Sequence, residues 1–130
     1  AKNEYDLSLI YYFTALQVYK NLYGEKHTSV ALSCYNIGAI YINKNEYDLS
    51  LEYFNKALEI YKDLYDEKHN NVISVYNNIG FVYSSKNEFD LAFEYYSKSL
   101  QVCKELHGEE HACVADNFYF TGIVFSKMGL

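Results

Sequence analysis

The sequence predicts an all-α protein of about six antiparallel helices, and three observations lead to that fold class. A unit of 42 residues recurs along the 130-residue chain, apolar side chains recur at helical spacing within each unit, and the chain has no proline. Average usage would give about six prolines in a chain of this length. Their absence allows long uninterrupted helices, because no residue forces a break.

The repeat is the strongest of these observations. Residues 2–7 recur at 44–49, and again at 86–91 with Phe in place of Tyr. Segments 2–43 and 44–85 are identical at more than half of their positions, which chance does not produce. The glycines and histidines that keep the period are Gly38, Gly80 and Gly122, and His27, His69 and His111.

We predict a single repeat array over residues 1–130, because one helix pair cannot bury its apolar faces alone whereas stacked pairs bury them jointly. Its parts are a partial repeat at 2–27, repeats at 28–69 and 70–111, and a partial repeat at 112–130. The array is expected to be a fragment of a longer one.

Each unit predicts a long helix followed by a short helix. The first long helix ends near Gly24, a short helix spans about 29–44, and the next long helix spans about 46–65, with equivalents 42 residues later. The apolar stripes of the short and long helices are Val30, Cys34, Ile37 and Tyr41, and Leu51, Phe54, Ala57, Leu58, Tyr61 and Leu64. The mid-helix glycine, which costs roughly 1 kcal/mol relative to alanine, indicates close approach of a bulky residue such as Tyr53 or Phe54.

The helix ends have local causes. Gly and Asn tolerate the left-handed backbone conformation, and Ser, Thr and Asn are good N-caps. The expected turn residues are Asn3, Asn45 and Asn87, with Gly129 in the last unit, and Gly24, Asp66 and Gly108 after the long helices. The expected N-caps are Thr28 or Ser29 and Asn70 or Asn71, with a weaker cap in the last unit at Ala112 and Cys113.

Charge and composition exclude several function classes. The net charge of −6 disfavours binding to nucleic acid, which needs clustered positive charge. It also disfavours a basic membrane surface, and no apolar run approaches the length that spans a bilayer. Three cysteines, an odd number without paired spacing, favour reduced thiols in a cytoplasmic protein.

Spaced residues within the unit resemble the tetratricopeptide repeat. The pattern is Cys34-x-x-Ile37-Gly38-x-x-Tyr41, then Asn45-x-Tyr47-x-x-Ser50-x-x-x-Phe54-x-x-Ala57. The usual repeat has about 34 residues, and this 42-residue unit is similar to the variant seen in kinesin light chains. The chain departs from that variant where Thr28, Asn70 and Ala112 follow the loop histidine in place of proline. The resemblance implies a right-handed superhelical solenoid that acts as a non-catalytic scaffold for protein–protein interaction.

Side chains that could carry chemistry have simpler interpretations in the repeat. Cys103, His107, His111 and Cys113 could bind zinc, but three of them replace helix-face or cap residues of the other units, and His111 is the recurring loop histidine. The loop histidines are expected to bond backbone groups, and Cys34 is expected to lie in the core. We therefore expect no enzyme, no metal and no cofactor.

The resemblance implies a peptide-binding groove lined by the short helices. Its predicted residues are Tyr35, Asn36, Ala39, Ile42 and Asn43, then Asn77, Asn78, Phe81 and Ser85, then Tyr119, Ile123 and Lys127. Leu32, Ser74, Ser84, Asp116 and Ser126 are further groove positions that the resemblance implies. Lys127 is the only basic side chain of the set, so we expect an apolar or mixed protein segment as the partner and not a strongly acidic one. The alternative is plain exposed helix surface.

A second hypothesis comes from the end helices. The last one carries Phe118, Phe120, Ile123, Val124 and Phe125, so it is apolar on more than one face. Such a surface favours self-association. The alternative function is therefore a structural repeat module that forms a homo-oligomer through its exposed terminal helices.

Overall fold

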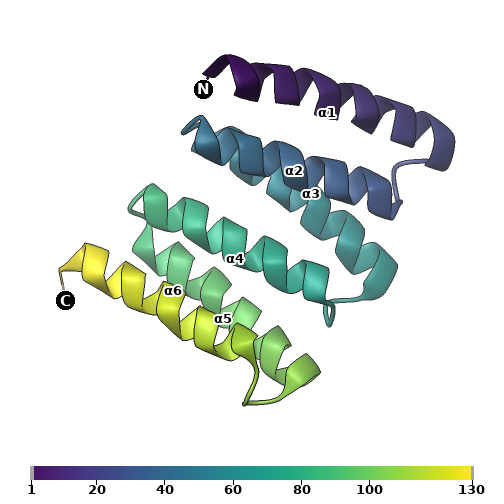
Figure 1. Ribbon diagram of the computed structural model, residues 1–130. Helices are drawn as coiled ribbons and strands as arrows, with labels where there is room; N and C mark the ends of the chain where they lie inside the picture. The colour runs from purple at the N-terminus through teal and green to yellow at the C-terminus, as the bar shows by residue number, and fades with distance from the viewer. Residues whose placement is uncertain (1, 130) are drawn as a thin grey trace. The chain divides into compact units, whose positions relative to one another are not determined.

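The computed structural model describes residues 2–129, and all regular structure in that range is α-helical. The helices are α1 (Lys2–Tyr23), α2 (Thr28–Asn43), α3 (Tyr47–Tyr65), α4 (Asn70–Ser85), α5 (Phe89–His107) and α6 (Ala112–Met128). Short loops join successive helices (Figure 1). The predicted all-α fold is thus confirmed, and the predicted helices agree with the observed ones to within a residue at the compared ends.

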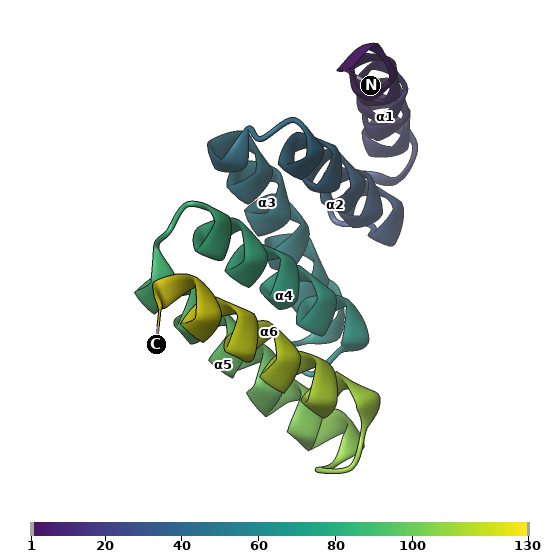
Figure 2. The same cartoon turned by 60° about the vertical axis from the view of Figure 1, so that its left-hand side comes forward.

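The chain divides into two compact units of three helices each. Unit 1 is Ala1–Asp66 with α1, α2 and α3, and unit 2 is Glu67–Leu130 with α4, α5 and α6. In unit 1, α2 packs against both α1 and α3. In unit 2, α5 packs against both α4 and α6, and α4 and α6 lie side by side (Figures 1 and 2). The organisation as one array, with the repeat boundaries given above, stays a prediction.

The core of unit 1 forms where α2 approaches α3 at Gly38. A Cβ atom added to Gly38 would lie 2.9 Å from the ring of Phe54, and Phe54 is completely buried. Ser50 of α3 donates a buried hydrogen bond from its Oγ to the Gly38 carbonyl oxygen, at 2.7 Å. The predicted close approach by Phe54 is therefore confirmed, and a backbone-directed hydrogen bond reinforces it.

Unit 2 repeats this contact between α4 and α5. A Cβ atom added to Gly80 would lie 2.8 Å from the ring of Tyr96, whose other neighbour is the stacked ring of Phe120 in α6. Asn117 of α6 donates a buried hydrogen bond from its Nδ2 to the Tyr96 carbonyl oxygen, at 2.7 Å. Gly122 of α6 differs from the other two helix glycines, because an added Cβ would have no neighbour within 4 Å.

The short helices begin with a histidine cap that the sequence interpretation assigned to other residues. α2 and α4 start at Thr28 and Asn70, so these predicted caps lie inside the helices. Each N-cap histidine accepts a hydrogen bond at Nδ1 from the backbone N–H two residues later, at 3.1 Å. The pairs are His27 with Ser29, His69 with Asn71, and His111 with Cys113. The prediction of a weaker cap on the last helix was therefore wrong, whereas the predicted bonding of loop histidines to the backbone is confirmed.

Most of the predicted turn residues have positive φ. Asn45 and Asn87 have φ of 59° and 62°, and Gly129 has φ 79° and ψ 20° in the left-handed region. Asp66 also has a positive φ, 70°, but its ψ of 179° is extended. Asn3 was wrongly predicted at a turn, because it lies inside α1.

The three helix glycines form a matched set for testing the packing. We expect Gly38→Ala and Gly80→Ala each to destabilise the protein by about 1–3 kcal/mol, because a methyl group would overpack a filled core. Gly122→Ala should instead stabilise it by up to about 1 kcal/mol, because only the helix propensity changes there. Urea unfolding followed by circular dichroism measures all three. Equal effects at the three positions would contradict the assigned contacts.

Candidate functional site

In unit 1, the predicted groove residues lie along one face of α2. Tyr35, Asn36, Ala39 and Ile42 are half-buried, and Asn43 is exposed. The rings of Tyr35 and Phe54 form an edge-to-face pair, with centroids 5.6 Å apart. Tyr35 thus packs against the core while part of its surface stays accessible, an arrangement that suits an aromatic side chain at a binding surface.

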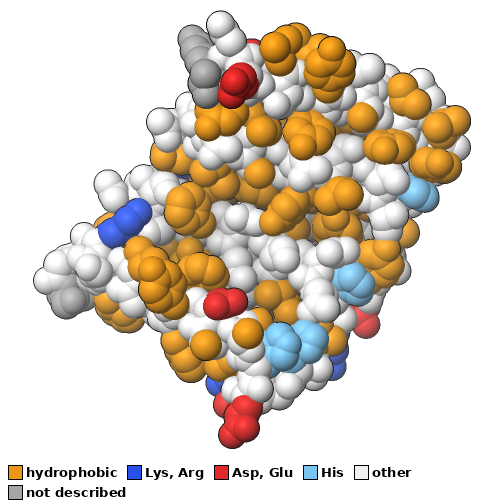
Figure 3. Space-filling model, viewed as in Figure 1, with side chains coloured by type: hydrophobic (Ala, Val, Ile, Leu, Met, Phe, Trp, Pro, Cys, Tyr) orange, Lys and Arg blue, Asp and Glu red, His pale blue; other side chains and the backbone are white. Residues whose placement is uncertain are grey.

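In unit 2, the predicted residues lie on the adjacent helices α4 and α6. Phe81, Tyr119 and Ile123 are large apolar side chains with 46%, 69% and 40% of their surface exposed. Lys127 is also exposed, whereas Asn77, Asn78 and Ser85 are half-buried. Figure 3 shows hydrophobic side chains at the surface over these two helices. We call this set the α4–α6 face.

The two asparagines of the α4–α6 face have different environments. Asn78 donates from Nδ2 to the carbonyl oxygen of Ser74, one turn earlier in α4, at 3.0 Å. The Oδ1 atom of Asn77 is buried and has no hydrogen-bond partner within the described part of the chain. An unpaired buried acceptor is destabilising. Ser84, which the sequence interpretation placed beside these residues, is buried and was wrongly assigned to the surface.

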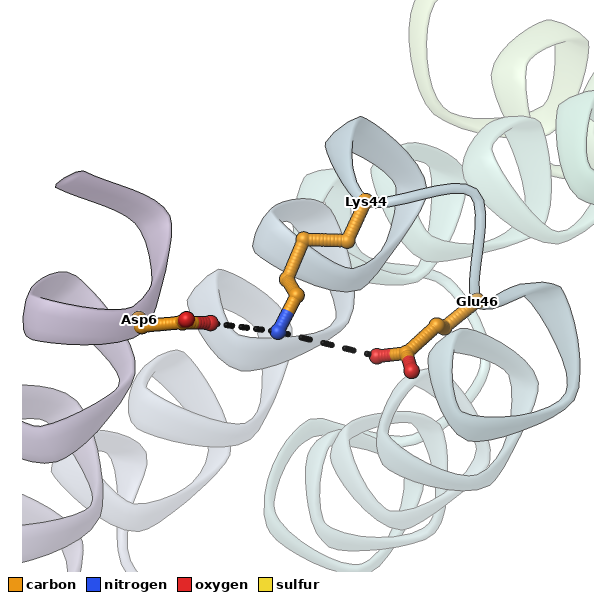
Figure 4. A network of polar contacts seen from close by, with 3 residues as sticks. All are labelled: Asp6, Lys44 and Glu46. Atoms are coloured by element: carbon orange, nitrogen blue, oxygen red, sulfur yellow. Dashed lines mark hydrogen bonds and ion pairs between the residues drawn. The ribbon is translucent and has the colours of Figure 1, made fainter. Parts of the chain in front are cut away.

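An ion-pair network in unit 1 is centred on Lys44. In unit 1, the Nζ of Lys44 lies 2.5 Å from Oδ1 of Asp6 and 3.9 Å from a carboxylate oxygen of Glu46 (Figure 4). The hydrogen bond to Asp6 raises the pKa of Lys44, with further attraction from both carboxylates. Lys44 thereby links α1 to the turn between α2 and α3, which is a structural role.

Comparison with known proteins decides the family. The sequence matches the tetratricopeptide repeat model at residues 1–63, 31–96 and 71–130. The chain belongs to the tetratricopeptide repeat family. Its 42-residue unit is the kinesin-light-chain-like variant.

The fold is similar to the crystal structure of BtubC (BKLC) from P. vanneervenii. The TM-score is 0.87 at 26% sequence identity, and the match covers 98% of this chain and 51% of that chain. This tetratricopeptide protein therefore spans about half the length of the similar structure. No curated protein matches its sequence.

Tetratricopeptide repeats mediate protein–protein interaction and are typically non-catalytic. Protein partners are therefore the class that the family indicates. Across residues 2–129, none of the helices combines the length and the apolar character that crossing a bilayer requires.

Cys103 and Cys113 join α5 to α6 through a disulfide, with a Cα–Cα distance of 6.2 Å. This differs from the expectation of reduced, unpaired cysteines. The two residues are ten apart, on either side of the loop that contains Gly108. The pairing was not predicted, because Cys103 and Cys113 were interpreted only as a possible zinc site or as replacements of helix-face and cap residues. The signal that could have found it is that two cysteines flank one helix–helix loop, whereas the equivalent pairs 61/71 and 19/29 contain no cysteine.

His111 lies beside this disulfide, and ligand atoms of Cys103, His111 and Cys113 lie within 4.8 Å of one another. The His111 ring stacks on His107, with centroids 4.1 Å apart, and Nε2 of His107 lies 2.6 Å from Oδ1 of Asn70. A neutral imidazole that accepts at Nδ1 carries its proton at Nε2. Metal binding by His111 would therefore require loss of its helix cap or a change of tautomer. The cluster as folded forms a cap and a disulfide.

Cys34, the free thiol, lies in the core of unit 1. Burial raises its pKa, and this effect outweighs the opposing charges of Lys20 and Lys56. Cys34 lines an open cavity of about 320 Å³ whose other walls mix both charges. They comprise Lys20, Glu25, Lys26, Val30, Lys56, Glu59, Ile60 and Asp63. A protonated buried thiol is a poor nucleophile, so Cys34 is not an activated nucleophile in this cavity.

Alkaline pH should destabilise both units through buried tyrosines. Burial raises the pKa of Tyr61 in unit 1 and of Tyr96 in unit 2 to about 12, whereas an unfolded tyrosine ionises near pH 10. Both contributions are present below about pH 10 and are lost as the pH rises toward about 12. Urea unfolding at a series of alkaline pH values should show this loss. Tyr96→Phe should make this alkaline loss of stability shallower, because phenylalanine does not ionise. The fold should accept the change, since the equivalent position 54 already carries Phe.

Tyr11→Phe is the matched control, because Tyr11 is exposed. It should leave the alkaline loss of stability unchanged. An identical pH profile for the wild type and Tyr96→Phe would contradict the role of Tyr96.

Proposed function

We propose that this tetratricopeptide protein is a non-catalytic scaffold that holds a peptide or an extended partner segment on the faces of its short helices. In unit 1 the supporting surface is the α2 face from Tyr35 to Asn43, and in unit 2 it is the α4–α6 face. The observation that carries the proposal is the combination in unit 2 of exposed Phe81, Tyr119 and Ile123 with half-buried amides.

The chemistry of the α4–α6 face specifies the class of peptide. Partly exposed aromatic side chains supply contact area at low entropic cost, and they are frequent among residues that dominate binding energy. The Asn78 amide and a rotated Asn77 amide could bond a peptide backbone, which would also pair the orphaned Oδ1 of Asn77. Lys127 is the one basic side chain of the predicted set. The ligand is therefore apolar or mixed, and not strongly acidic or a nucleic acid.

Selection of peptides from a random display library on the 130-residue protein tests this function. We expect the enriched peptides to carry aliphatic and aromatic residues and few carboxylates. A selected peptide should slow amide hydrogen exchange in α4 and α6. The pair Asn78→Ala and Phe81→Ala should abolish measurable capture, and Phe81→Ala alone should weaken it by about tenfold or more, as loss of a hot-spot residue does. Helicity should remain intact.

Leu91→Ala and Leu106→Ala are the matched controls. Both leucines are exposed in the same unit, but they lie on α5. They should leave peptide affinity unchanged. Peptides that protect α5 instead, or that bind the Asn78 and Phe81 variants as tightly as the wild type, would overturn the assignment.

Self-association is a second candidate function, and a specific observation on α6 favours it. Phe118 and Phe125 have 59% and 44% of their surface exposed, and a Cβ atom added to Gly122 would have no neighbour within 4 Å. The equivalent residues of α4 are Tyr76, Tyr83 and Gly80. Tyr76 and Gly80 are buried beside α5, where Gly80 contacts Tyr96. A helix of a second copy could cover α6 in the same way, which would bury an exposed apolar surface.

Sedimentation velocity over a concentration series separates the two functions. If α6 mediates self-association, the weight-average mass should rise with concentration, and Phe118→Ser together with Phe125→Ser should return the protein to a monomer. A monomer at all concentrations would exclude this candidate. An oligomer in which amide hydrogen exchange slows at the α4–α6 face would instead exclude peptide binding at that face.

The expected absence of a cofactor and the cytoplasmic location stay predictions.

A further inference from the structure

The cysteine pair of unit 2 is a coordinated replacement within the repeat. Positions 103 and 113 correspond to Tyr61 and Asn71 one 42-residue repeat earlier, and to Tyr19 and Ser29 two repeats earlier. Of these three pairs of equivalent positions, only 103 and 113 are both cysteine, and their side chains are bonded. Two unrelated replacements would not be expected to fall on the two members of one contact. The pair is therefore a feature of its own and not part of the common repeat framework.

The two sulfurs have opposite environments. Cys113 is the second residue of α6 and is half-buried, so a thiolate there is stabilised by the positive end of the helix dipole. Cys103 lies near the carboxyl end of α5 and is completely buried, and both features disfavour its thiolate. Cys113 is thus suited to be the attacking thiol, and Cys103 the second thiol that closes the disulfide.

We propose that Cys103 and Cys113 form a reversible thiol–disulfide exchange site that reacts with a small disulfide such as oxidised glutathione. In the first step, the Cys113 thiolate attacks one sulfur of glutathione disulfide. The glutathione S–S bond breaks, a mixed disulfide forms on Cys113, and one glutathione thiolate leaves and takes up the proton that Cys113 lost.

In the second step, Cys103 loses its proton and attacks the Sγ atom of Cys113. The mixed disulfide breaks, the Cys103–Cys113 bond forms, and the second glutathione leaves as a thiol. The two cysteines lose two electrons, and glutathione disulfide gains them as it becomes two thiols. Reduced glutathione reverses both steps.

The exchange controls how firmly α6 is held in unit 2. The disulfide fixes the first turn of α6 to α5, and the buried residues of α6 itself are Val114, Asn117 and Val124. Reduction removes the covalent link and leaves non-covalent packing to hold the helix, including the ring contacts of Phe120 with Tyr96 and of Phe125 with Phe93. Because Tyr119 and Ile123 of the α4–α6 face lie on α6, reduction would also loosen that face. This last consequence rests on the proposed function, whereas the exchange chemistry does not.

Trapping the mixed disulfide tests the assigned order of attack. Reduced protein is mixed with glutathione disulfide, quenched by alkylation and analysed by peptide mass spectrometry. The wild type should form the Cys103–Cys113 disulfide, and Cys103→Ser should accumulate glutathione on Cys113. Cys113→Ser should acquire glutathione on Cys103 at least about tenfold more slowly, because that thiol is buried. Buried Cys34 is the internal control and should stay unmodified.

Failure of the wild type to form the disulfide in a glutathione buffer would overturn the proposal, as would equal glutathione uptake by the two serine variants. Circular dichroism first establishes that both variants keep the helicity of the wild type. Hydrogen exchange then supplies a readout that is independent of any peptide ligand. Reduction should speed exchange in the first turns of α6 by about tenfold or more and leave α2 in unit 1 unchanged. Unchanged exchange in α6 would exclude control of that helix by the disulfide.

Discussion

The contact between a helix glycine and an aromatic ring is the constraint on which each unit depends. Gly38 receives Phe54, and Gly80 receives Tyr96, at distances that leave no room for a Cβ atom. Glycine is unfavourable in a helix interior, but at these positions it lets two helices approach closely enough to interlock. The approach also fixes the rotation of each short helix. The face that carries the glycine must point at the ring, and some other positions, such as Phe81, are left toward solvent.

The structure shows why the repeat was such a strong predictor of the fold. Periodic apolar residues act through local geometry, so their spacing alone indicates which helix face is buried. Asn45 and Asn87 could likewise be assigned from intrinsic backbone preference, and both have positive φ. The interpretation failed at the helix N-caps, where the outcome depended on a hydrogen bond between a side chain and the backbone of its own helix. Histidine is an uncommon N-cap, and Nδ1 of His69 replaces the hydroxyl or amide oxygen that the usual capping preference selects.

The candidate site could be predicted only in part, because exposure depends on which neighbours a helix has. Tyr119 was placed correctly on an accessible surface, since its position lies opposite the core stripe. Ser84 was not, because it lies close in register to the buried stripe of α4 and packs inward. The disulfide required a distance across a loop, and spacing along the sequence carries no direct information on that distance.

Comparison of the three short helices separates the requirements of folding from the freedom to bind. The mid-helix glycine is Gly38, Gly80 and Gly122 in turn, and each of the three helices has a histidine N-cap. Other positions of the same helices vary: one is Ala39, Phe81 and Ile123, and another is Tyr35, Asn77 and Tyr119. The invariant positions are those whose side chains, or lack of one, determine backbone geometry. The side chains at the variable positions differ in size and polarity, while the glycine and the histidine cap are kept. A stacked helical repeat can therefore acquire a specific surface while its fold stays the same.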